Sequence, residues 1–171
     1  MKNVVLIGFM GTGKTAVGRR LARLLGWRFV DTDTEIEQLT GKSVARIFAE
    51  DGEVRFRSEE NLLCRRLAPL TGLVIATGGG MVLNPENVAL LRQNGVLIKL
   101  YASPEVIIER IKSKRKKRPL LKGKLEERVN ELLEMRKGVY DIAEFAINTG
   151  KQDTDQSARI IYEYLKGKGI Q

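Results

Sequence analysis

The sequence predicts an α/β fold built on a parallel sheet, and three features of the chain lead to this class. Short apolar runs typical of buried parallel strands alternate with longer segments whose apolar residues recur at helical spacing. Glycine-rich or acidic segments directly follow several of these runs, as expected where a strand leads into a helix. The alternation of strand and helix favours a parallel sheet covered by helices.

The predicted elements follow one another in a regular order. Strands are expected at residues 4–7, 27–30, 73–76, 96–100 and 145–147. Helices are expected at 14–25, in pieces over 34–68 with breaks near Gly41 and Gly52, from 85 to Gly95, from 104 onward, at about 125–138 and near 153–167. No internal repeat or Ser/Pro-rich linker divides the chain, so residues 1–171 are expected to form a single domain.

The composition excludes several kinds of chemistry. The 171 residues include no histidine, which rules out Ser/His and Cys/His nucleophile systems and histidine-ligated metals. A general base must then be a carboxylate, Lys, Tyr or the single cysteine, Cys64. One cysteine cannot form an internal disulfide, and no apolar run is long enough for a signal peptide or a membrane helix. We therefore expect a cytoplasmic location without a membrane partner.

A phosphate-binding loop is the strongest motif in the sequence. Residues 8–15 read GFMGTGKT, which fits G-x-x-x-x-G-K-[ST] between a predicted strand and a predicted helix. Glycines in such a loop let backbone N–H groups converge on phosphate oxygens, and the helix N-terminus adds further donors. Lys14 can reach the β- and γ-phosphates, and Thr15 can offer its hydroxyl to Mg²⁺. The motif predicts binding of ATP with Mg²⁺.

Parallel α/β sheets bind ligands outside the carboxyl ends of their strands. Two further predicted strands are followed there by residues that can bind a ligand. Asp31 and Asp33 follow the second strand: one can face a metal and the other a substrate, although either can instead simply cap a helix. Without histidine, an aspartate is the natural group to accept the proton of an attacking hydroxyl. Gly78–Gly80 follow the third strand and either form a tight turn or let backbone amides approach an oxygen-rich ligand.

A possible anion-binding arginine lies in the predicted helical segment after the second strand. Arg57 has Glu60 three residues further on, which would let an ion pair hold the guanidinium for a bidentate contact with a carboxylate. The alternative is that Arg57 is an ordinary solvated charge on a helix.

Together these features resemble the shikimate kinase family, P-loop kinases that phosphorylate the 3-hydroxyl of shikimate with ATP. The resemblance spans nearly the whole chain, and its motifs are GFMGTGKT at 8–15, DTD at 31–33, FRSEE at 56–60, ATGGG at 76–80, RPLL at 118–121 and RKGVY at 136–140. The phosphate loop is common to many families, whereas the combination of the other motifs is far more specific.

The resemblance implies a three-layer P-loop fold like that of nucleoside-monophosphate kinases. Its parallel sheet would have five strands in the order 2-3-1-4-5 with helices on both faces, a substrate-binding helical region at about 33–61, and a mobile lid at about 112–124. ATP and shikimate are the implied substrates and Mg²⁺ the implied cofactor. We expect a monomer that binds no nucleic acid.

The family motifs also imply a role for individual residues. Asp33, Lys14 and Arg118 would be catalytic, with Asp33 as the base and Arg118 reaching the transferred phosphate from the lid. Shikimate would be bound by Asp33, by Arg57 (oriented by Glu60) and Arg136 on its carboxylate, and by the backbone of Gly79 and Gly80. ATP and Mg²⁺ would be bound by Gly11, Thr12, Gly13, Lys14, Thr15, Arg110 and Arg118, with Thr15 and Asp31 holding the metal. Phe48 and Phe56 would line the apolar side of the pocket, or equally belong to the core.

The family's adenine loop often contains a proline, which residues 148–153 lack, so no adenine contact is assigned there. The basic charge of the chain is also local. Residues 112–124 contain eight Lys and Arg and no acid, which accounts for nearly all of the net charge of +9. Two other functions compete with the resemblance: a kinase of the same fold with another acceptor, and an ATPase that binds nucleic acid. No helix-turn-helix, zinc-finger or RNA-recognition motif supports the second.

Overall fold

A computed structural model of the chain describes residues 2–114 and 122–170. Its five strands are all parallel and lie in the order β2-β3-β1-β4-β5, as the family resemblance implies. Their bounds are Asn3–Ile7 (β1), Arg28–Asp31 (β2), Leu73–Ala76 (β3), Gly95–Tyr101 (β4) and Phe145–Asn148 (β5). Val5 of β1 is in register with Ile75 of β3 on one side and Leu97 of β4 on the other.

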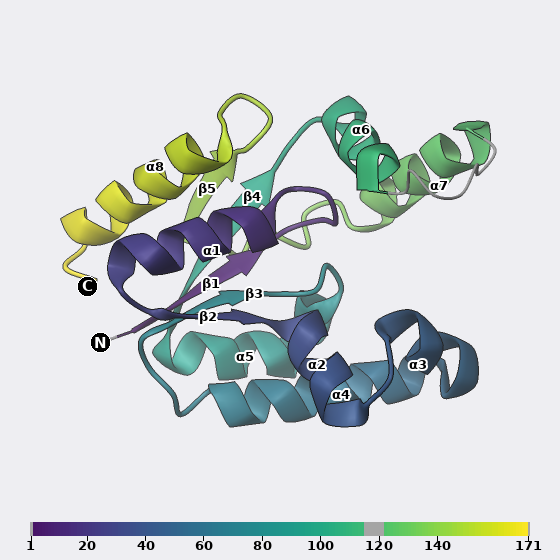
Figure 1. Ribbon diagram of the computed structural model, residues 1–171, viewed down its shortest axis with the longest axis horizontal. Helices are drawn as coiled ribbons and strands as arrows, with labels where there is room; N and C mark the ends of the chain where they lie inside the picture. The colour runs from purple at the N-terminus through teal and green to yellow at the C-terminus, as the bar shows by residue number, and fades with distance from the viewer. Residues whose placement is uncertain (1, 115–121, 171) are drawn as a thin grey trace.

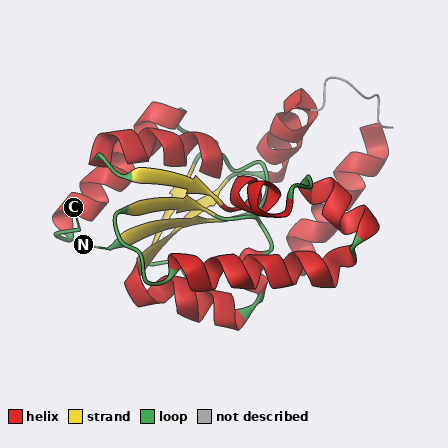
Figure 2. Ribbon diagram, turned by 60° about the horizontal axis from the view of Figure 1, so that its bottom comes forward, coloured by secondary structure: helices red, strands yellow, loops and turns green. Residues whose placement is uncertain are grey.

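Helices cover both faces of this sheet (Figure 2). Helices α1 (Lys14–Leu25) and α8 (Thr154–Gly167) pack together on one face, and α4 (Gly52–Leu67) and α5 (Pro85–Asn94) pack together on the other. Side chains of β1 alternate between the two resulting cores: Val4 and Leu6 join the core under α1 and α8, whereas Val5 and Ile7 join the core under α4 and α5. The central strands are therefore apolar on both sides, as parallel strands between two helical layers must be.

The carboxyl ends of the strands all point to one end of the molecule, toward the right of Figure 1. There α6 (Pro104–Lys114) and α7 (Lys122–Met135) lie on one side, and α2 (Thr32–Thr40) and α3 (Val44–Glu50) on the other. A short 3-10 helix, η1 (Met81–Leu83), follows β3. The two chain termini lie at the opposite end, so this end is left to the loops that carry the predicted functional residues.

Most predicted elements are confirmed, and the differences have local causes. Residues 34–68 form three helices, with Gly41 in the left-handed conformation after α2 and Gly52, at a φ of 84°, as the first residue of α4. Strand β2 begins one residue later than predicted and includes Asp31. Helix α7 ends at Met135 rather than near 138, because the chain turns at Gly138, whose φ is 77°.

Most of the segment predicted as a lid, residues 115–121, lies outside the described residues, so the lid stays a prediction. Helix α6 continues through Lys114 and α7 begins at Lys122, so both ends of the predicted range 112–124 are helical. Arg118 lies outside the described residues. Across residues 2–114 and 122–170, no helix is both long and apolar enough to span a membrane.

Candidate active site

The phosphate loop connects β1 to α1 at the carboxyl edge of the sheet. Gly8, Gly11 and Gly13 have φ values of 145°, 74° and 92°, a region that side-chain-bearing residues rarely adopt. The hydroxyl of Thr12 donates to the Phe9 carbonyl at 2.7 Å, which closes the loop on itself. The backbone of the predicted ATP-binding residues therefore has the curvature that a phosphate cradle needs.

Lys14 is buried at the start of α1, and its ammonium group turns back into the loop. Its Nζ donates to the carbonyls of Gly8 and Phe9, both at 2.8 Å. Burial lowers the pKa of Lys14 to about 8, although the negative charges of Asp33 and Asp31 oppose this shift. A bound phosphate would add a direct anionic partner for this buried ammonium group, whose hydrogen bonds within the protein go to neutral carbonyls.

The hydroxyl of Thr15 donates to Oδ2 of Asp31 at 2.7 Å, which joins the phosphate loop to the end of β2. The other oxygen of Asp31 caps α2 by accepting from the backbone N–H groups of Asp33 and Thr34. The interpretation of Asp31 as a helix cap is therefore confirmed, whereas its role in binding a metal stays a prediction. A hydroxyl next to a carboxylate suits Mg²⁺, which commonly takes one or two protein oxygens and completes its shell with water and phosphate. Among the described residues, no three Cys, Asp or Glu side chains lie together so that they could hold a metal ion. A metal at Thr15 and Asp31 would therefore also need water or phosphate ligands.

Asp33 is largely buried in the first turn of α2, and its carboxylate is not used by the fold. Its Oδ1 is shielded from solvent and has no hydrogen-bond partner among residues 2–114 and 122–170. Burial, followed by the negative charge of Asp31, raises the pKa of Asp33, whereas Lys14 acts in the opposite direction. Unlike Asp31, Asp33 is available to a ligand.

Arg57 and Glu60 form an ion pair on α4. Nη1 of Arg57 donates to Oε2 of Glu60 at 2.8 Å, and its Nη2 lies 3.2 Å from Oε1 of Glu53. The Glu60 side chain is 1% exposed and that of Arg57 is 28% exposed. A buried carboxylate therefore holds a guanidinium that a ligand can still reach. Burial raises the pKa of Glu60 despite the opposing charge of Arg57. The arrangement favours the predicted bound arginine over an ordinary solvated charge.

Gly78, Gly79 and Gly80 form a turn over which three charged side chains lie. A Cβ on Gly78 would lie 2.7 Å from Oδ1 of Asp33, and one on Gly79 would lie 3.2 Å from Nη1 of Arg136. A Cβ on Gly80 would overlap the guanidinium of Arg57. None of the three glycines has a positive φ, so what the turn requires is the absence of side chains. The structure brings Asp33, Arg57 and Arg136 together around this turn, as predicted.

Arg110 of α6 lies on the other side of the phosphate loop. Its guanidinium donates to the carbonyl of Gly11 at 3.2 Å and to the hydroxyl and carbonyl of Thr149 at 3.0 and 2.6 Å. It lines a cavity of about 330 Å³ together with Gly13, Lys114, Thr149, Gln152 and Asp153. The cavity adjoins the phosphate loop and is a suitable place for the remainder of a nucleotide.

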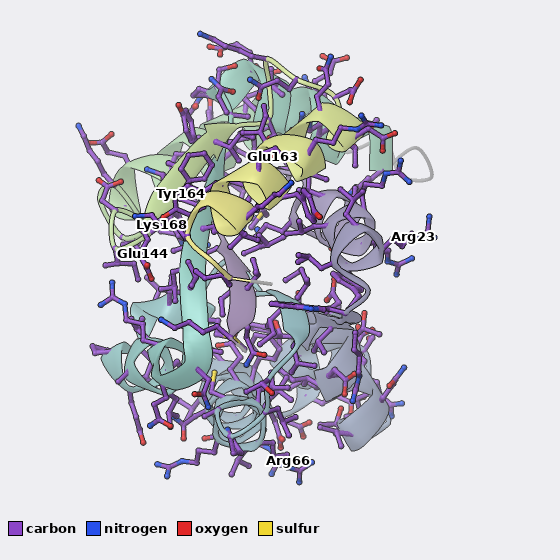
Figure 3. The ribbon with its side chains drawn as sticks, turned by 90° about the vertical axis from the view of Figure 1, so that its left-hand side faces the viewer. Arg23, Arg66, Glu144, Glu163, Tyr164 and Lys168 are labelled. Atoms are coloured by element: carbon purple, nitrogen blue, oxygen red, sulfur yellow. The ribbon has the colours of Figure 1, made fainter. Side chains whose placement is uncertain are left out.

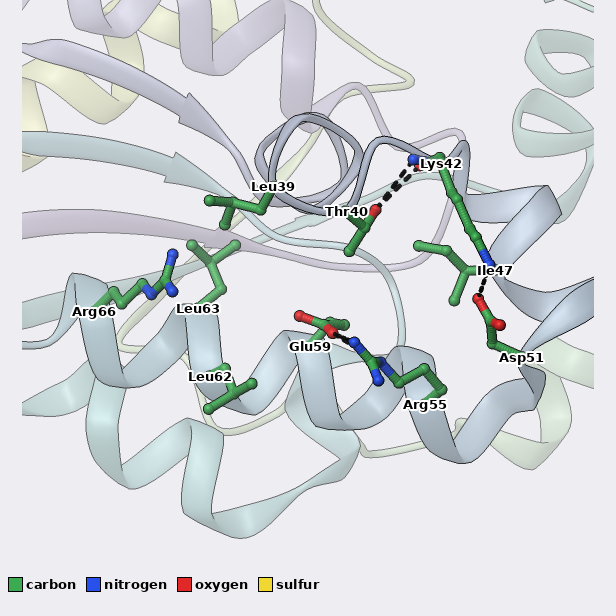
Figure 4. A pocket seen from close by; sticks show the side chains of 10 residues that line it. All are labelled: Leu39, Thr40, Lys42, Ile47, Asp51, Arg55, Glu59, Leu62, Leu63 and Arg66. Atoms are coloured by element: carbon green, nitrogen blue, oxygen red, sulfur yellow. Dashed lines mark hydrogen bonds and ion pairs between the residues drawn. The ribbon is translucent and has the colours of Figure 1, made fainter.

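The two predicted pocket phenylalanines differ in burial. Phe56 is 4% exposed and belongs to the core, whereas Phe48 is 39% exposed and packs against Phe56 with ring centroids 4.8 Å apart. A separate cavity of about 410 Å³ lies between α2, α3 and α4 (Figure 4), where Lys42 pairs with Asp51 and Arg55 with Glu59. These pairs already satisfy the charges of Lys42 and Arg55, so this cavity is a weaker anion site than the glycine turn.

Three residues around the site were not predicted. Thr32 accepts a hydrogen bond from the Gly78 N–H, Tyr140 donates to the Gly79 carbonyl, and the Thr149 hydroxyl donates to the Thr12 carbonyl. Thr32 and Tyr140 stand within motifs that the resemblance includes, DTD and RKGVY, but no spacing rule distinguishes them from their neighbours.

The fold and the site define the class of protein: a P-loop kinase with an acceptor site for a small anion. The family model described as shikimate kinase matches residues 10–166, and the chain belongs to the shikimate kinase family.

Relatives and solved structures agree with this assignment. The chain is 63% identical to a shikimate kinase of Desulforudis audaxviator, covering 99% of this chain and 89% of that protein. It is 61% identical to a shikimate kinase of Pelotomaculum thermopropionicum, covering 97% and 96%. The structure of shikimate kinase from Acinetobacter baumannii in complex with shikimate superposes with a TM-score of 0.89 at 34% identity, covering 100% of this chain and 96% of the other.

Proposed function

We propose that this chain transfers a phosphate from ATP to the 3-hydroxyl of shikimate, giving shikimate 3-phosphate for aromatic amino-acid biosynthesis. One observation carries the proposal for the site. Three groups surround a turn that has no side chains of its own: the guanidinium groups of Arg57 and Arg136, and an oxygen of Asp33 that is buried and has no hydrogen-bond partner among the described residues. Shikimate has a carboxylate and neighbouring hydroxyls, which are the groups that two arginines and one aspartate can bind.

Arg57 and Arg136 bind the carboxylate of shikimate in this proposal. A planar guanidinium can form two parallel hydrogen bonds to a carboxylate, and Arg57 is already held by Glu60 at 2.8 Å. The guanidinium of Arg136 lies over the ring of Phe9, 5.7 Å from its centroid, which limits its movement. The backbone of Gly79 and Gly80 lies between the two arginines and contacts the body of the substrate.

Asp33 orients the 3-hydroxyl and accepts its proton as the oxygen attacks the γ-phosphate. The raised pKa of Asp33 supports this role, because a base whose pKa lies nearer to the working pH takes up a proton more readily. Phosphoryl transfer otherwise needs positioning and charge stabilisation more than covalent chemistry.

Lys14 and the backbone of Gly11, Thr12 and Gly13 bind the β- and γ-phosphates. Thr15 and Asp31, joined at 2.7 Å, would hold Mg²⁺. When bound, Mg²⁺ neutralises phosphate charge and helps to align the γ-phosphate. Arg110 contacts the nucleoside, and Arg118 takes its role from the family resemblance alone: a cation for the transferred phosphate.

The proposal treats residues 1–171 as a single domain with its substrate-binding region at about 33–61 and a mobile lid within about 112–124. It also includes a monomeric, cytoplasmic enzyme that needs neither nucleic acid nor a membrane. Attraction between the local basic charge and anionic substrates should weaken as salt is added.

A coupled assay of ADP release tests the proposed function directly. ATP, Mg²⁺ and the full chain are combined with shikimate, with gluconate, with nucleoside monophosphates, and with DNA or RNA. We expect turnover with shikimate only. Turnover with another acceptor and none with shikimate would indicate a different kinase of this fold, and stimulation by nucleic acid alone would indicate an ATPase that binds it.

A further inference from the structure

The glycine turn is held by two hydroxyl groups that come from distant parts of the chain. The N–H of Gly78 donates to Oγ1 of Thr32 at 2.9 Å, across 46 residues of sequence. The hydroxyl of Tyr140 donates to the Gly79 carbonyl at 2.6 Å, across 61 residues. Thr32 is completely buried and Tyr140 is 7% exposed. Both hydroxyls are thus used within the protein and hold one short segment from two directions.

Each of the two hydroxyl-bearing residues is close in sequence to a charged residue. That charged residue faces the same glycine to which the hydroxyl is hydrogen-bonded. Thr32 directly precedes Asp33, whose Oδ1 is 2.7 Å from where a Gly78 Cβ would lie. Tyr140 is four residues after Arg136, whose Nη1 is 3.2 Å from where a Gly79 Cβ would lie. Each hydrogen bond therefore fixes the separation between a glycine and the charged side chain above it.

Neither hydroxyl bonds to the phosphate loop. The phosphate loop is closed by other contacts, those of Thr12, Lys14 and Thr15. Although the Gly79 Cβ position lies 3.5 Å from the backbone N of Met10, loss of either hydroxyl should therefore affect the acceptor site more than the ATP site.

We propose that Thr32 and Tyr140 are positioning residues for the acceptor substrate. Their hydroxyls hold the glycine turn at the distance from Asp33 and Arg136 at which both side chains reach shikimate. The proposal rests on the proposed function, because shikimate is taken as the acceptor. Small displacements are important here, because a misplacement of about 1 Å can lower a rate about 100-fold.

The competing explanation is that these are ordinary buried hydrogen bonds that stabilise the fold and nothing else. It predicts a lower melting temperature with unchanged Michaelis constants. The two explanations are separated by measuring the Michaelis constants for both substrates together with stability.

The experiment uses the full chain in four forms: Thr32→Val, Thr32→Ser, Tyr140→Phe, and Thr32→Val with Tyr140→Phe. Valine has nearly the shape of threonine without the hydroxyl, and serine retains the hydroxyl. Tyr164→Phe is the matched control: Tyr164 lies on α8 beside Glu144 and Lys168 (Figure 3), with its hydroxyl 3.4 Å from the Glu144 carbonyl.

We expect Thr32→Val and Tyr140→Phe each to raise the KM for shikimate about tenfold and to lower kcat, with the KM for ATP changed less than about twofold. Thr32→Ser should restore most of the loss, and Tyr164→Phe should behave as wild type. Because both hydroxyls hold the same turn, the double variant should lose less than the product of the two single effects.

Several results would overturn the proposal. They are an unchanged shikimate KM in both single variants, an equal rise in the KM for ATP, no rescue by serine, or fully multiplicative effects. If Thr32→Val does not fold, Tyr140→Phe and Thr32→Ser still provide the comparison.

A second measurement separates this proposal from the proposed function. Hydrogen exchange of the Gly78 amide, followed without substrate, should be at least about tenfold faster in Thr32→Val than in wild type. Unchanged exchange would contradict the role of Thr32 even in an active enzyme. A wild-type protein inactive with shikimate would instead contradict the proposed function.

Discussion

Arg57 donates to Glu60 at 2.8 Å, and the Glu60 side chain is only 1% exposed, so a buried carboxylate fixes this arginine, while its second partner, Glu53, is 66% exposed. The second oxygen of Glu60 is buried without a hydrogen-bond partner in the part of the chain that the structure describes. A buried charge with a single cationic partner depends heavily on that partner. The pair therefore links the acceptor site to the stability of α4.

Replacing Arg57 by alanine should raise the KM for shikimate about 100-fold while the KM for ATP stays within about twofold. Arg57→Lys retains the charge but loses the planar fork, and we expect a rise of about tenfold. Initial-rate kinetics with each substrate varied in turn provide the measurement.

Arg55→Ala is the matched control for Arg57. Arg55 lies on the same helix and pairs with Glu59, but its side chain is 61% exposed and lines the separate cavity of Figure 4. We expect little change in either KM. Equal weakening of shikimate and ATP in Arg57→Ala would argue against a carboxylate-binding arginine.

Asp33→Asn should lower kcat by about 10²–10⁴-fold while ATP still binds, because the amide cannot accept the proton of the attacking hydroxyl. Its stability provides an internal check. Since the folded-state pKa of Asp33 is raised above its ordinary value of 3.8, the charged carboxylate disfavours the folded state at any pH above that value. The asparagine variant should thus melt no lower than wild type at pH 7. Near-normal turnover in a folded variant would refute the assigned role.

The general position of the site follows from local sequence and from the geometry of parallel sheets. Asp31, Asp33 and the three glycines each follow an apolar strand directly, and the carboxyl ends of parallel strands meet at one edge. Local patterns also predicted the strands closely, because apolar runs between two helical layers are distinctive. The strand order, by contrast, came from the family resemblance.

Contacts between distant segments could not be predicted in the same way. Thr32 and Tyr140 reach the glycine turn across 46 and 61 residues, and nothing in their own spacing indicates a partner at that distance. The residue pattern alone also leaves open which of the two aspartates is free, whereas the family resemblance implies that Asp33 is the base and Asp31 a metal ligand. The choice was decided by the backbone at the start of α2, where Asp31 is used both as a cap and as a partner of Thr15.

Substituting a glycine of the turn should damage the acceptor site specifically. Gly80→Ala places a Cβ where the guanidinium of Arg57 lies, so the arginine must move away. We expect the KM for shikimate to rise at least about tenfold, with a normal KM for ATP and a folded protein. Gly167→Ala is the control: beyond the chain neighbours and the backbone of α8 itself, no atom of the described residues lies within 4 Å of its Cβ position, and alanine there should add up to about 1 kcal/mol of stability. A Gly80→Ala enzyme with unchanged affinity for shikimate would exclude this turn as the acceptor site.

Burial lowers the pKa of Lys14 to about 8. The affinity for nucleotide should therefore decrease as the pH rises through about 8. Below that pH the ammonium is charged and attracts the phosphates. Between about 8 and its ordinary value of 10.5, the free enzyme holds a neutral amine that must first take up a proton before it can pair with phosphate.

Titration calorimetry with a non-hydrolysable ATP analogue from pH 7 to 9.5 should therefore show a Kd that increases towards tenfold per pH unit above 8, with proton uptake on binding. Lys14→Arg remains charged throughout this range, so whatever its absolute affinity, its Kd should change little with pH. A wild-type Kd that does not change over this interval would contradict a buried lysine titrating near 8.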